Sequence, residues 1–307
     1  MKKCAVIYNP NSGKHIKEDF TKDFIKILNN HDYEVDFIYT EYKYHAFKII
    51  EDLKDDVSLV ISIGGDGTFN EIMTGNLKRK KRLLLAHIPL GTANDLGAMF
   101  GYSKNIVNNL KLLLDGCVKG IDICIVNDRP FVYVAGFGKF LDVSYLTTSK
   151  MKRKWGYLAY LYNGLKSFFD KTNCYELTYT VNGETYRGKY SFALISNANR
   201  IAGINNFYKD IYLDDDTFEV LFCSLTKKKD IIKAVIGLKT SGINNVAGMY
   251  FHKTNKLSIK FDSVPKNNWC VDGEELIDKR KTYNISVIHD VKIMLPKKNV
   301  ASLFIKK

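Results

Sequence analysis

The chain has 307 residues, enough for two domains that each have a hydrophobic core. Hydrophobic residues make up 46% of it, which excludes an intrinsically disordered protein. The net charge of +13 favours anionic partners, such as nucleotides, nucleic acid or an acidic membrane face. No helix-turn-helix, zinc-finger or other nucleic-acid signature accompanies this charge, so we expect no nucleic-acid partner.

No apolar run reaches the roughly 18 residues that span a bilayer, and the first residues lead into a strand without the apolar segment of a signal peptide. This pattern predicts a cytoplasmic protein. The six cysteines are widely spaced and form no C-x-x-C pair, which is typical of reduced core thiols. Two basic runs, 78–82 and 150–154, are read either as solvated loops or as contacts with an anionic membrane surface.

The first part of the chain alternates strands with helices. Apolar spacing predicts strands at 3–8, 35–40, 59–63 and 83–88, helices at 20–28 and 44–53, a helix from near Thr68 and a short helix from Asp95. This alternation predicts a parallel sheet with helices on both faces. Ligands of such sheets bind beyond the carboxyl ends of the strands. Three of these ends, at the turn-forming segment Asn9-Pro-Asn-Ser-Gly13, at Thr40 and at Gly64, therefore point at one crevice.

The stretch Gly64-Gly-Asp-Gly-Thr68 joins a buried strand to a helix. Such a turn presents backbone N–H groups at a helix N-terminus, where a phosphate binds. Asp66 would repel that phosphate unless a cation lies between them, so it implies magnesium. Asp95 supplies a second acid at the same sheet edge, and Asp122 supplies a third. The alternative is an ordinary glycine turn capped by Asp and Thr.

From about residue 124 the helical alternation mostly stops and strands of period two predominate. They are expected at 175–181, 185–196, 218–224, 256–261 and 283–295, interrupted by helices around 155–169 and 229–238. This pattern predicts an antiparallel sandwich or barrel.

Two acidic segments lie in this second half. Asp214-Asp-Asp216 offers oxygen donors that suit a hard cation, or else it is a solvated turn. Asp272 and Glu274 follow an apolar run and flank a glycine, which is typical of a hairpin turn. If the segment is instead extended, residues two apart point the same way, and both carboxylates could face a substrate.

Four motifs together resemble, in order and spacing, the catalytic domain of the diacylglycerol kinase family, specifically the soluble bacterial lipid kinases. They are Asn9 to Gly13, Gly64 to Thr68 with Asn70 and Glu71, Pro89 to Asp95, and Asp272 to Glu274. The resemblance covers essentially the whole chain. It implies an α/β nucleotide-binding domain at 1–123, to which 296–307 return, a β-sandwich domain at 124–295, and an active site in the cleft between them.

The resemblance also implies the activity and the residues that perform it. The enzyme would transfer phosphate from ATP to a lipid hydroxyl in a magnesium-dependent reaction, converting diacylglycerol to phosphatidate. Glu274 matches the proton acceptor, which Asp272 would support. The acids that match the network organising the catalytic magnesium are Asp66, Asp95 and Asp122. The residues that match ATP-binding positions are Asn9, Pro10, Asn11, Ser12, Gly13, Thr40, Gly64, Gly65, Asp66, Gly67, Thr68, Phe69, Asn70, Glu71, Thr92 and Asn94.

A structural magnesium site is implied as well. Asp215 would be its side-chain ligand, and Tyr212 and Thr217 would contribute main-chain oxygens. The match is imperfect, because the family commonly has Asp-Asp-Gly where this chain has an acid, Asp216, in place of the glycine.

Two alternatives stay open. An NAD kinase shares the Gly-Gly-Asp-Gly signature but is not expected to have Asn9 to Gly13 or Pro89 to Asp95. A catalytically silent lipid-binding or regulatory protein could keep the same fold. As partners we expect a lipid alcohol, which the sequence does not identify, and an anionic membrane that the protein binds peripherally; a homodimer is left open.

Overall fold

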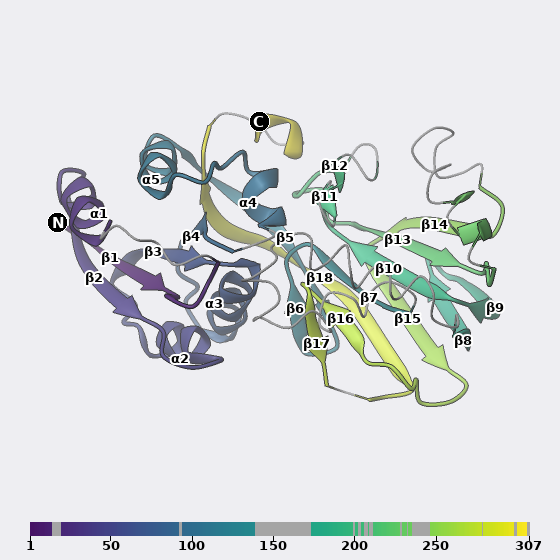
Figure 1. Ribbon diagram of the computed structural model, residues 1–307. Coiled ribbons are helices and arrows are strands. Elements are labelled where there is room, and N and C mark those ends of the chain that lie inside the picture. Colours follow the sequence, from purple (N-terminus) through teal and green to yellow (C-terminus); the bar gives the residue numbers. More distant parts are fainter. Residues whose placement is uncertain are drawn as a thin grey trace. The chain divides into compact units, whose positions relative to one another are not determined.

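The computed structural model forms two compact units (Figure 1), Met1–Ile121 with His289–Lys307, and Asp122–Ile288. The residues that it describes are 1–13, 20–91, 94–138, 173–198, 200–201, 204–205, 208, 211–227, 229–231, 233–234, 246–277, 279–297 and 300–305. The unit boundaries fall inside two strands, β5 (Cys117–Val126) and β18 (Thr282–Leu295). The chain therefore returns to the first unit at His289 and not at residue 296. The reason is that the last part of β18 already pairs with β4 of the first unit.

The first unit is built on a parallel sheet. Its strand order is β2-β1-β3-β4, and the end of β18 pairs with β4 in parallel at Ile293 and Leu85. The four strands are β1 (Lys2–Tyr8), β2 (Tyr33–Tyr39), β3 (Val57–Gly64) and β4 (Leu85–Pro89). Each lies within two residues of its predicted bounds, because every strand is a short apolar run closed by turn-forming residues.

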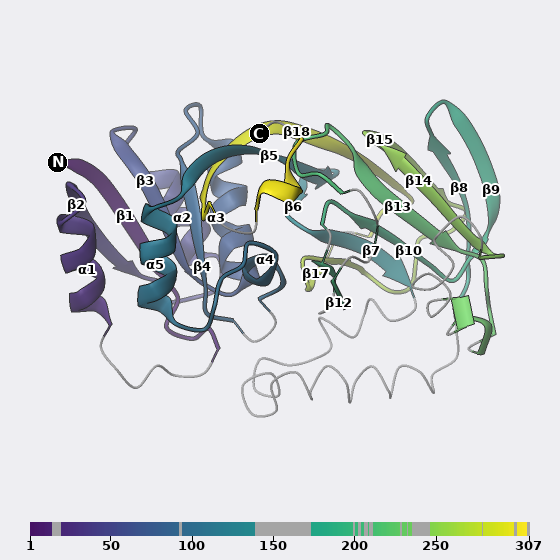
Figure 2. The same cartoon turned by 90° about the horizontal axis from the view of Figure 1, so that it is seen from above.

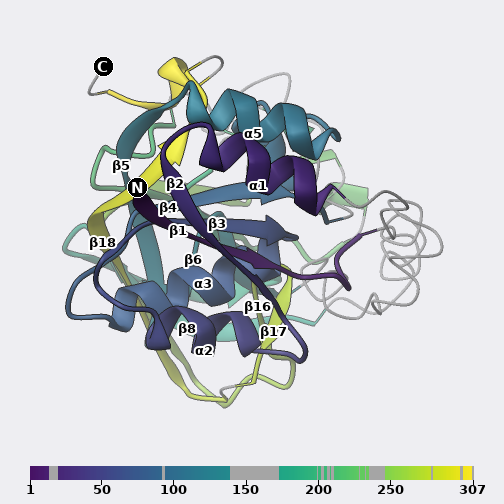
Figure 3. The ribbon, with the colours of Figure 1, turned by 90° about the vertical axis from the view of Figure 1, so that its left-hand side faces the viewer.

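Helices cover both faces of this sheet, as the alternation predicted. Figure 3 shows α1 (Thr21–Asn29) and α5 (Ile106–Leu114) on one face, with α2 (His45–Asp52) and α3 (Asp66–Lys78) on the other. Figure 2 shows α1 and α5 side by side. Their buried residues are spaced for one helical face and pack on the strands in a single core; they are Phe24, Leu28, Ile106, Leu110 and Leu113. The unit also contains α4 (Asp95–Met99) and a 3₁₀ turn, η2 (Ala301–Leu303).

The second unit is a sandwich of two sheets. One is antiparallel, in the order β14-β13-β10-β7-β16-β17, with bounds Met249–Thr254, Phe218–Cys223, Phe192–Ser196, Val134–Gly138, Trp269–Val271 and Glu274–Leu276. In the other, the first part of β18 pairs with β15, β15 with β8, and β8 with β9; their bounds are Lys256–Phe261, Tyr175–Val181 and Glu184–Tyr190. β5 pairs with β6 (Arg129–Phe131), and the short β11 (Arg200–Ile201) with β12 (Ile204–Asn205).

One predicted strand of the second unit is wrong. Residues 185–196 were expected to form a single strand, but β9 ends at Tyr190 and β10 begins at Phe192, in the opposite sheet. Ser191 is the crossing point, where its N–H donates to Cys223 O at 2.7 Å. The apolar pattern continues through the crossing because both segments face the same core. The helix expected around 155–169 lies outside the described residues. Within 229–238, residues 229–231 and 233–234 are helical.

All six cysteines are free thiols, and Cys4, Cys124, Cys223 and Cys270 are buried. In the described part of the chain, no helix is both long enough and apolar enough to cross a membrane.

Aromatic rings from both sheets fill the core of the sandwich. The ring of Tyr179 on β8 stacks on that of Phe222 on β13, with 3.9 Å between their centroids. The ring of Trp269 on β16 stacks on that of Tyr283 on β18, with 4.5 Å between their centroids, and all four side chains are buried. These contacts hold the two sheets together through buried apolar area.

We expect Phe222→Ala to lower the free energy of unfolding by about 3–5 kcal/mol, because it removes a buried ring and leaves a cavity. Tyr250→Ala is the matched control, since Tyr250 is the strand partner of Phe222 on β14 but is 43% exposed. Its cost should be about 1 kcal/mol or less. Urea denaturation followed by tryptophan fluorescence measures both. Equal losses would show that the inter-sheet core does not dominate stability.

Candidate active site

The segment after β1 is tied to the glycine turn after β3. Asn9 Nδ2 donates to Thr68 Oγ1 at 2.9 Å, and Asn9 Oδ1 accepts from Asn11 N–H at 2.9 Å. Ser12 Oγ accepts from Gly65 N–H at 3.2 Å. Polar side chains of the first loop therefore brace both the second loop and the first turn of α3.

Glycines allow a third loop, after β4, to pack on these two. A Cβ on Gly91 would lie 2.8 Å from Gly65 Cα and 2.7 Å from Asn94 Oδ1. Gly13 has a φ of +66°, and a Cβ there would lie 2.0 Å from Leu90 O. Real side chains do not fit at such distances, so the three loops approach one another through bare backbone.

The first acids of the predicted network, Asp66 and Asp95, lie together at this edge. α3 begins at Asp66, two residues before the predicted start, and α4 begins at Asp95. The N–H of Asp95 donates to Asp66 Oδ2 at 3.1 Å. The Asp66 side chain is only 9% exposed, and Asp95 is buried. The structure thus places two carboxylates at two helix N-termini, where the helix dipole favours negative charge.

His87, on β4, is a polar neighbour that the sequence analysis missed. Its Nε2 lies 4.0 Å from Asp66 Oδ1, its Nδ1 lies 3.4 Å from Ser62 Oγ, and its ring packs on Phe69. Complete burial lowers its pKa to about 3, because desolvation disfavours the imidazolium. The ring is therefore neutral near pH 7 and forms no ion pair with Asp66. The sequence signal for this buried polar residue was a single histidine within the apolar run 83–88.

Several residues that match ATP-binding positions are buried or form hydrogen bonds with other residues of the first unit. Phe69 and Asn70 are buried, and Thr74 Oγ1 donates to Asn70 O at 2.7 Å. Glu71 Oε1 accepts from Tyr44 N–H at 3.0 Å. Phe69 and Asn70 are thus buried within α3, and Glu71 is tied to the residue before α2.

The other members of that set lie at the loops and strand ends. Asn94 has a φ of +49° and donates from Nδ2 to Gly91 O at 2.6 Å, so it braces the third loop. Thr40 follows β2, and its N–H donates to Tyr8 O at 2.9 Å. Pro10 lies in the loop after β1, and Gly67 is the second residue of α3. Thr92 lies outside the described residues.

In the second unit, Asp272 and Glu274 lie on one hairpin. β16 and β17 pair antiparallel with Val271 opposite Glu274, so Asp272 and Gly273 form a two-residue turn. Both turn residues have positive φ, +48° and +81°, which is typical of a type I′ hairpin. The expectation of an extended segment with both carboxylates on one side is therefore wrong, because the chain reverses between them.

The carboxylate of Asp272 is fully engaged by backbone. Its Oδ2 accepts from Val132 N–H at 2.7 Å, and its Oδ1 accepts from Tyr133 and Val134 N–H at 3.1 Å each. Asp272 is buried, whereas Glu274 is partly exposed on the adjoining strand. Asp272 therefore fixes the hairpin on β7 and the residues before it, and Glu274 is the more exposed of the two carboxylates.

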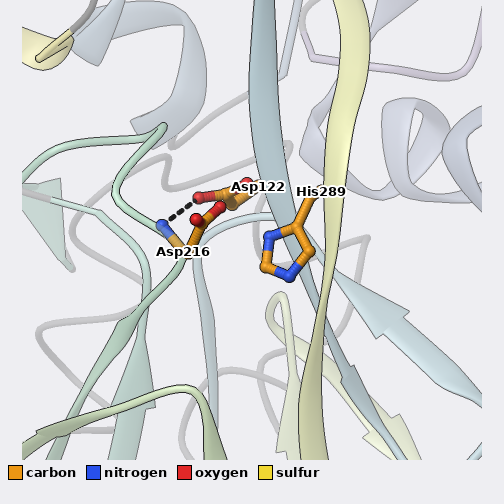
Figure 4. A group of neighbouring side chains, drawn as sticks. All are labelled: Asp122, Asp216 and His289. Carbon is orange, nitrogen blue, oxygen red and sulfur yellow. Dashed lines mark hydrogen bonds between the residues drawn. The ribbon is translucent and has the colours of Figure 1, made fainter.

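Asp122, the third predicted acid of the network, begins the second unit. Figure 4 shows it beside Asp216, whose N–H donates to Asp122 Oδ2 at 2.7 Å. The backbone of Asp122 is also held, by Leu213 O and by Asn197 Nδ2. Asp216 has a φ of +62°, a conformation that glycine adopts without strain and aspartate tolerates. The third side chain drawn in Figure 4, His289, belongs to the first unit.

The predicted ligand of a structural metal, Asp215, already has partners for both oxygens. Its Oδ1 accepts from Thr217 N–H at 3.1 Å and from Thr217 Oγ1 at 2.5 Å. Its Oδ2 lies 2.6 Å from Lys253 Nζ. The side chain of Tyr212 also faces this lysine, whose Nζ lies 5.9 Å from the ring centroid. These contacts do not fit a divalent ion bound through Asp215.

Comparison with known proteins identifies relatives of this chain. A family model described as the diacylglycerol kinase catalytic domain matches residues 3–126. A diacylglycerol kinase of Staphylococcus haemolyticus is 31% identical over 278 residues, which cover 89% of this chain and 83% of that protein. One of Bacillus subtilis is 28% identical over 279 residues, covering 89% and 90%.

A solved structure shows the same fold. The crystal structure of a diacylglycerol kinase from Bacillus anthracis str. Sterne matches with a TM-score of 0.76 at 23% identity, covering 96% of this chain and 97% of that chain. Fold similarity and sequence identity thus extend over nearly the whole chain and are not confined to the three loops. The chain belongs to the diacylglycerol kinase family of phosphotransferases.

Proposed function

We propose that the protein transfers the γ-phosphoryl group of ATP to the hydroxyl of a lipid, with diacylglycerol as acceptor and phosphatidate as product. The observation that carries the proposal is the bracing of three loops around Gly65, beside Asp66 and Asp95. Phosphoryl transfer needs mainly positioning and neutralisation of charge, and such a backbone-lined edge supplies both. The names of the curated relatives agree with this activity.

The loops of the first unit bind the nucleotide in this proposal. The α3 N-terminus attracts phosphate through backbone N–H groups and the helix dipole. Carboxylate oxygens are the hard ligands that Mg²⁺ prefers, and Asp66 and Asp95 supply such oxygens beside the loops. We assign Asp122 to the same acid network by family resemblance alone. When bound, Mg²⁺ would neutralise the charge between phosphates and acids. We assign the remaining loop positions, including Thr92, to ATP by family resemblance alone.

Glu274 is the proposed general base. A lipid hydroxyl has a high pKa and must lose its proton as the phosphoryl group arrives, which requires a carboxylate that can approach it. Glu274 is partly exposed and reaches farther than Asp272. Asp272 acts as a positioning residue, because its three hydrogen bonds to backbone hold the hairpin that carries Glu274.

We expect Asp66→Asn to lower kcat by about 10²-fold or more, because an amide removes the charge that holds the cation. The fold should persist, since the amide oxygen can still accept from Asp95 N–H. Asp52→Asn, on exposed helix surface in the same unit, is the control. Phosphorylation of diacylglycerol and thermal melting measure both effects. Near-normal turnover in folded Asp66→Asn would remove the metal role.

We expect Glu274→Gln to lower kcat by roughly 10²-fold or more, with the KM for ATP little changed, which is the usual effect of losing a general base. The matched control is Glu275→Gln, because Glu275 is the next residue on β17 and is exposed. Steady-state kinetics with varied ATP separates the two parameters. Retention of more than about a tenth of wild-type turnover by Glu274→Gln argues against its role as the base.

Asp272→Asn separates positioning from chemistry. Asparagine has one acceptor oxygen, so at least one of the three backbone N–H groups loses its partner, and we expect a loss of about 1.5–3 kcal/mol in stability. Turnover should fall because Glu274 shifts. A variant with wild-type stability and no turnover would instead identify Asp272 as the base.

The same proposal includes peripheral binding to anionic membranes, since the acceptor is a lipid. The basic run 150–154 lies outside the described residues. In the run 78–82, Arg79 is not available to lipid, because its guanidinium donates to Ile50 O and Leu53 O and pairs with Asp55. Lys80 and Arg82 are exposed. They are the members of this run that we assign to the membrane surface.

We expect binding to vesicles that contain anionic lipid to weaken as salt is raised to physiological strength, where screening acts over about 8 Å. Lys80→Glu with Arg82→Glu should weaken binding further than Lys22→Glu with Lys26→Glu, an equal charge change on exposed α1. Sedimentation with vesicles measures both. Vesicle binding that does not change with salt, or equal binding by the two double variants, would contradict the assignment of Lys80 and Arg82 to the membrane surface.

A further inference from the structure

A positively charged side chain that the family resemblance does not predict contacts the acidic loop before β13. Lys253 lies on β14, directly opposite Glu219 on β13. Its Nζ lies 2.6 Å from Asp215 Oδ2 and 3.8 Å from Glu219 Oε1. It also lies over the ring of Tyr212, 5.9 Å from the centroid. One ammonium group thus meets two acids and an aromatic face, all within the second unit.

The two acids are buried, so they require a positive partner. The side chain of Asp215 is 7% exposed and that of Glu219 is 3% exposed. Leaving carboxylates buried without a cation is strongly unfavourable.

A divalent ion would compete with this lysine for the same oxygen. Mg²⁺ binds carboxylate oxygens at about 2.0–2.1 Å and demands near-octahedral geometry. Oδ2 of Asp215 already faces the ammonium, while Oδ1 is shared by two groups of Thr217. An ion at Asp215 would therefore displace Lys253 or lie against its positive charge.

We propose that the ammonium of Lys253 takes the place of the structural metal ion at this loop, so that the β-sandwich unit is stable without a divalent cation. The lysine is part of the chain, and its charge therefore does not depend on the metal concentration. The inference concerns stability and does not rest on the proposed kinase activity.

The experiment measures thermal melting of nucleotide-free protein in a chelator and in millimolar Mg²⁺. The wild type should melt at the same temperature in both conditions. Lys253→Met should melt about 5–10 °C lower in chelator, because two buried acids lose their partner. Mg²⁺ should restore part of this loss. Lys256→Met, an exposed lysine on neighbouring β15, is the control and should behave as the wild type.

Two further measurements keep the proposal testable if Lys253→Met does not fold. Lys253→Arg should retain the wild-type melting temperature in chelator, since it keeps the charge. Metal analysis of dialysed wild-type protein should find no stoichiometric divalent ion. The proposal is overturned if the wild type loses several degrees in chelator or carries a stoichiometric metal. It is also overturned if Lys253→Met melts as the wild type, or if Mg²⁺ gives that variant no stabilisation.

Discussion

The close approach of bare backbone at Gly13, Gly65 and Gly91 is the constraint on which the candidate nucleotide site depends. A single Cβ on Gly91 would separate the loops after β3 and β4. Separation would also break the contact between Asp66 and the start of α4, because Asp95 N–H donates across the same gap. The side-chain bonds of Asn9 and Ser12 stabilise this packing. The packing of the loops and the placement of Asp66 and Asp95 therefore depend on the same close backbone contacts.

Most elements of the first unit could be predicted because they are locally encoded. For example, β1 is followed by asparagine, and β3 and β4 end in glycine and proline. The second unit was harder, since its pattern does not show where the chain changes sheets. The sequence pattern continues through the crossing at Ser191, so only the pairing of β9 and β10 with different strands reveals the change of sheet. Helix α5 was missed, although Ile106, Leu110 and Leu113 have helical spacing.

The same distinction holds for the candidate site. Its loops could be found from short motifs, whereas the partners of its acids come from distant parts of the chain. Asp272 accepts from backbone N–H groups near Val132, and Asp215 faces Lys253, which lies on another strand. No local pattern marks either contact. The roles of the two hairpin acids and the cation at the acidic loop therefore became visible only in the fold.

The central claim is that this member of the family is an active lipid kinase. The most direct measurement incubates purified protein with ATP labelled in the γ-phosphoryl group, Mg²⁺, and in turn diacylglycerol, other lipid alcohols and NAD. The account predicts labelled phosphatidate from diacylglycerol and no labelled product from NAD. Label transferred to NAD, or no transfer to any lipid by folded protein, would contradict it and favour an NAD kinase or a catalytically silent lipid-binding protein.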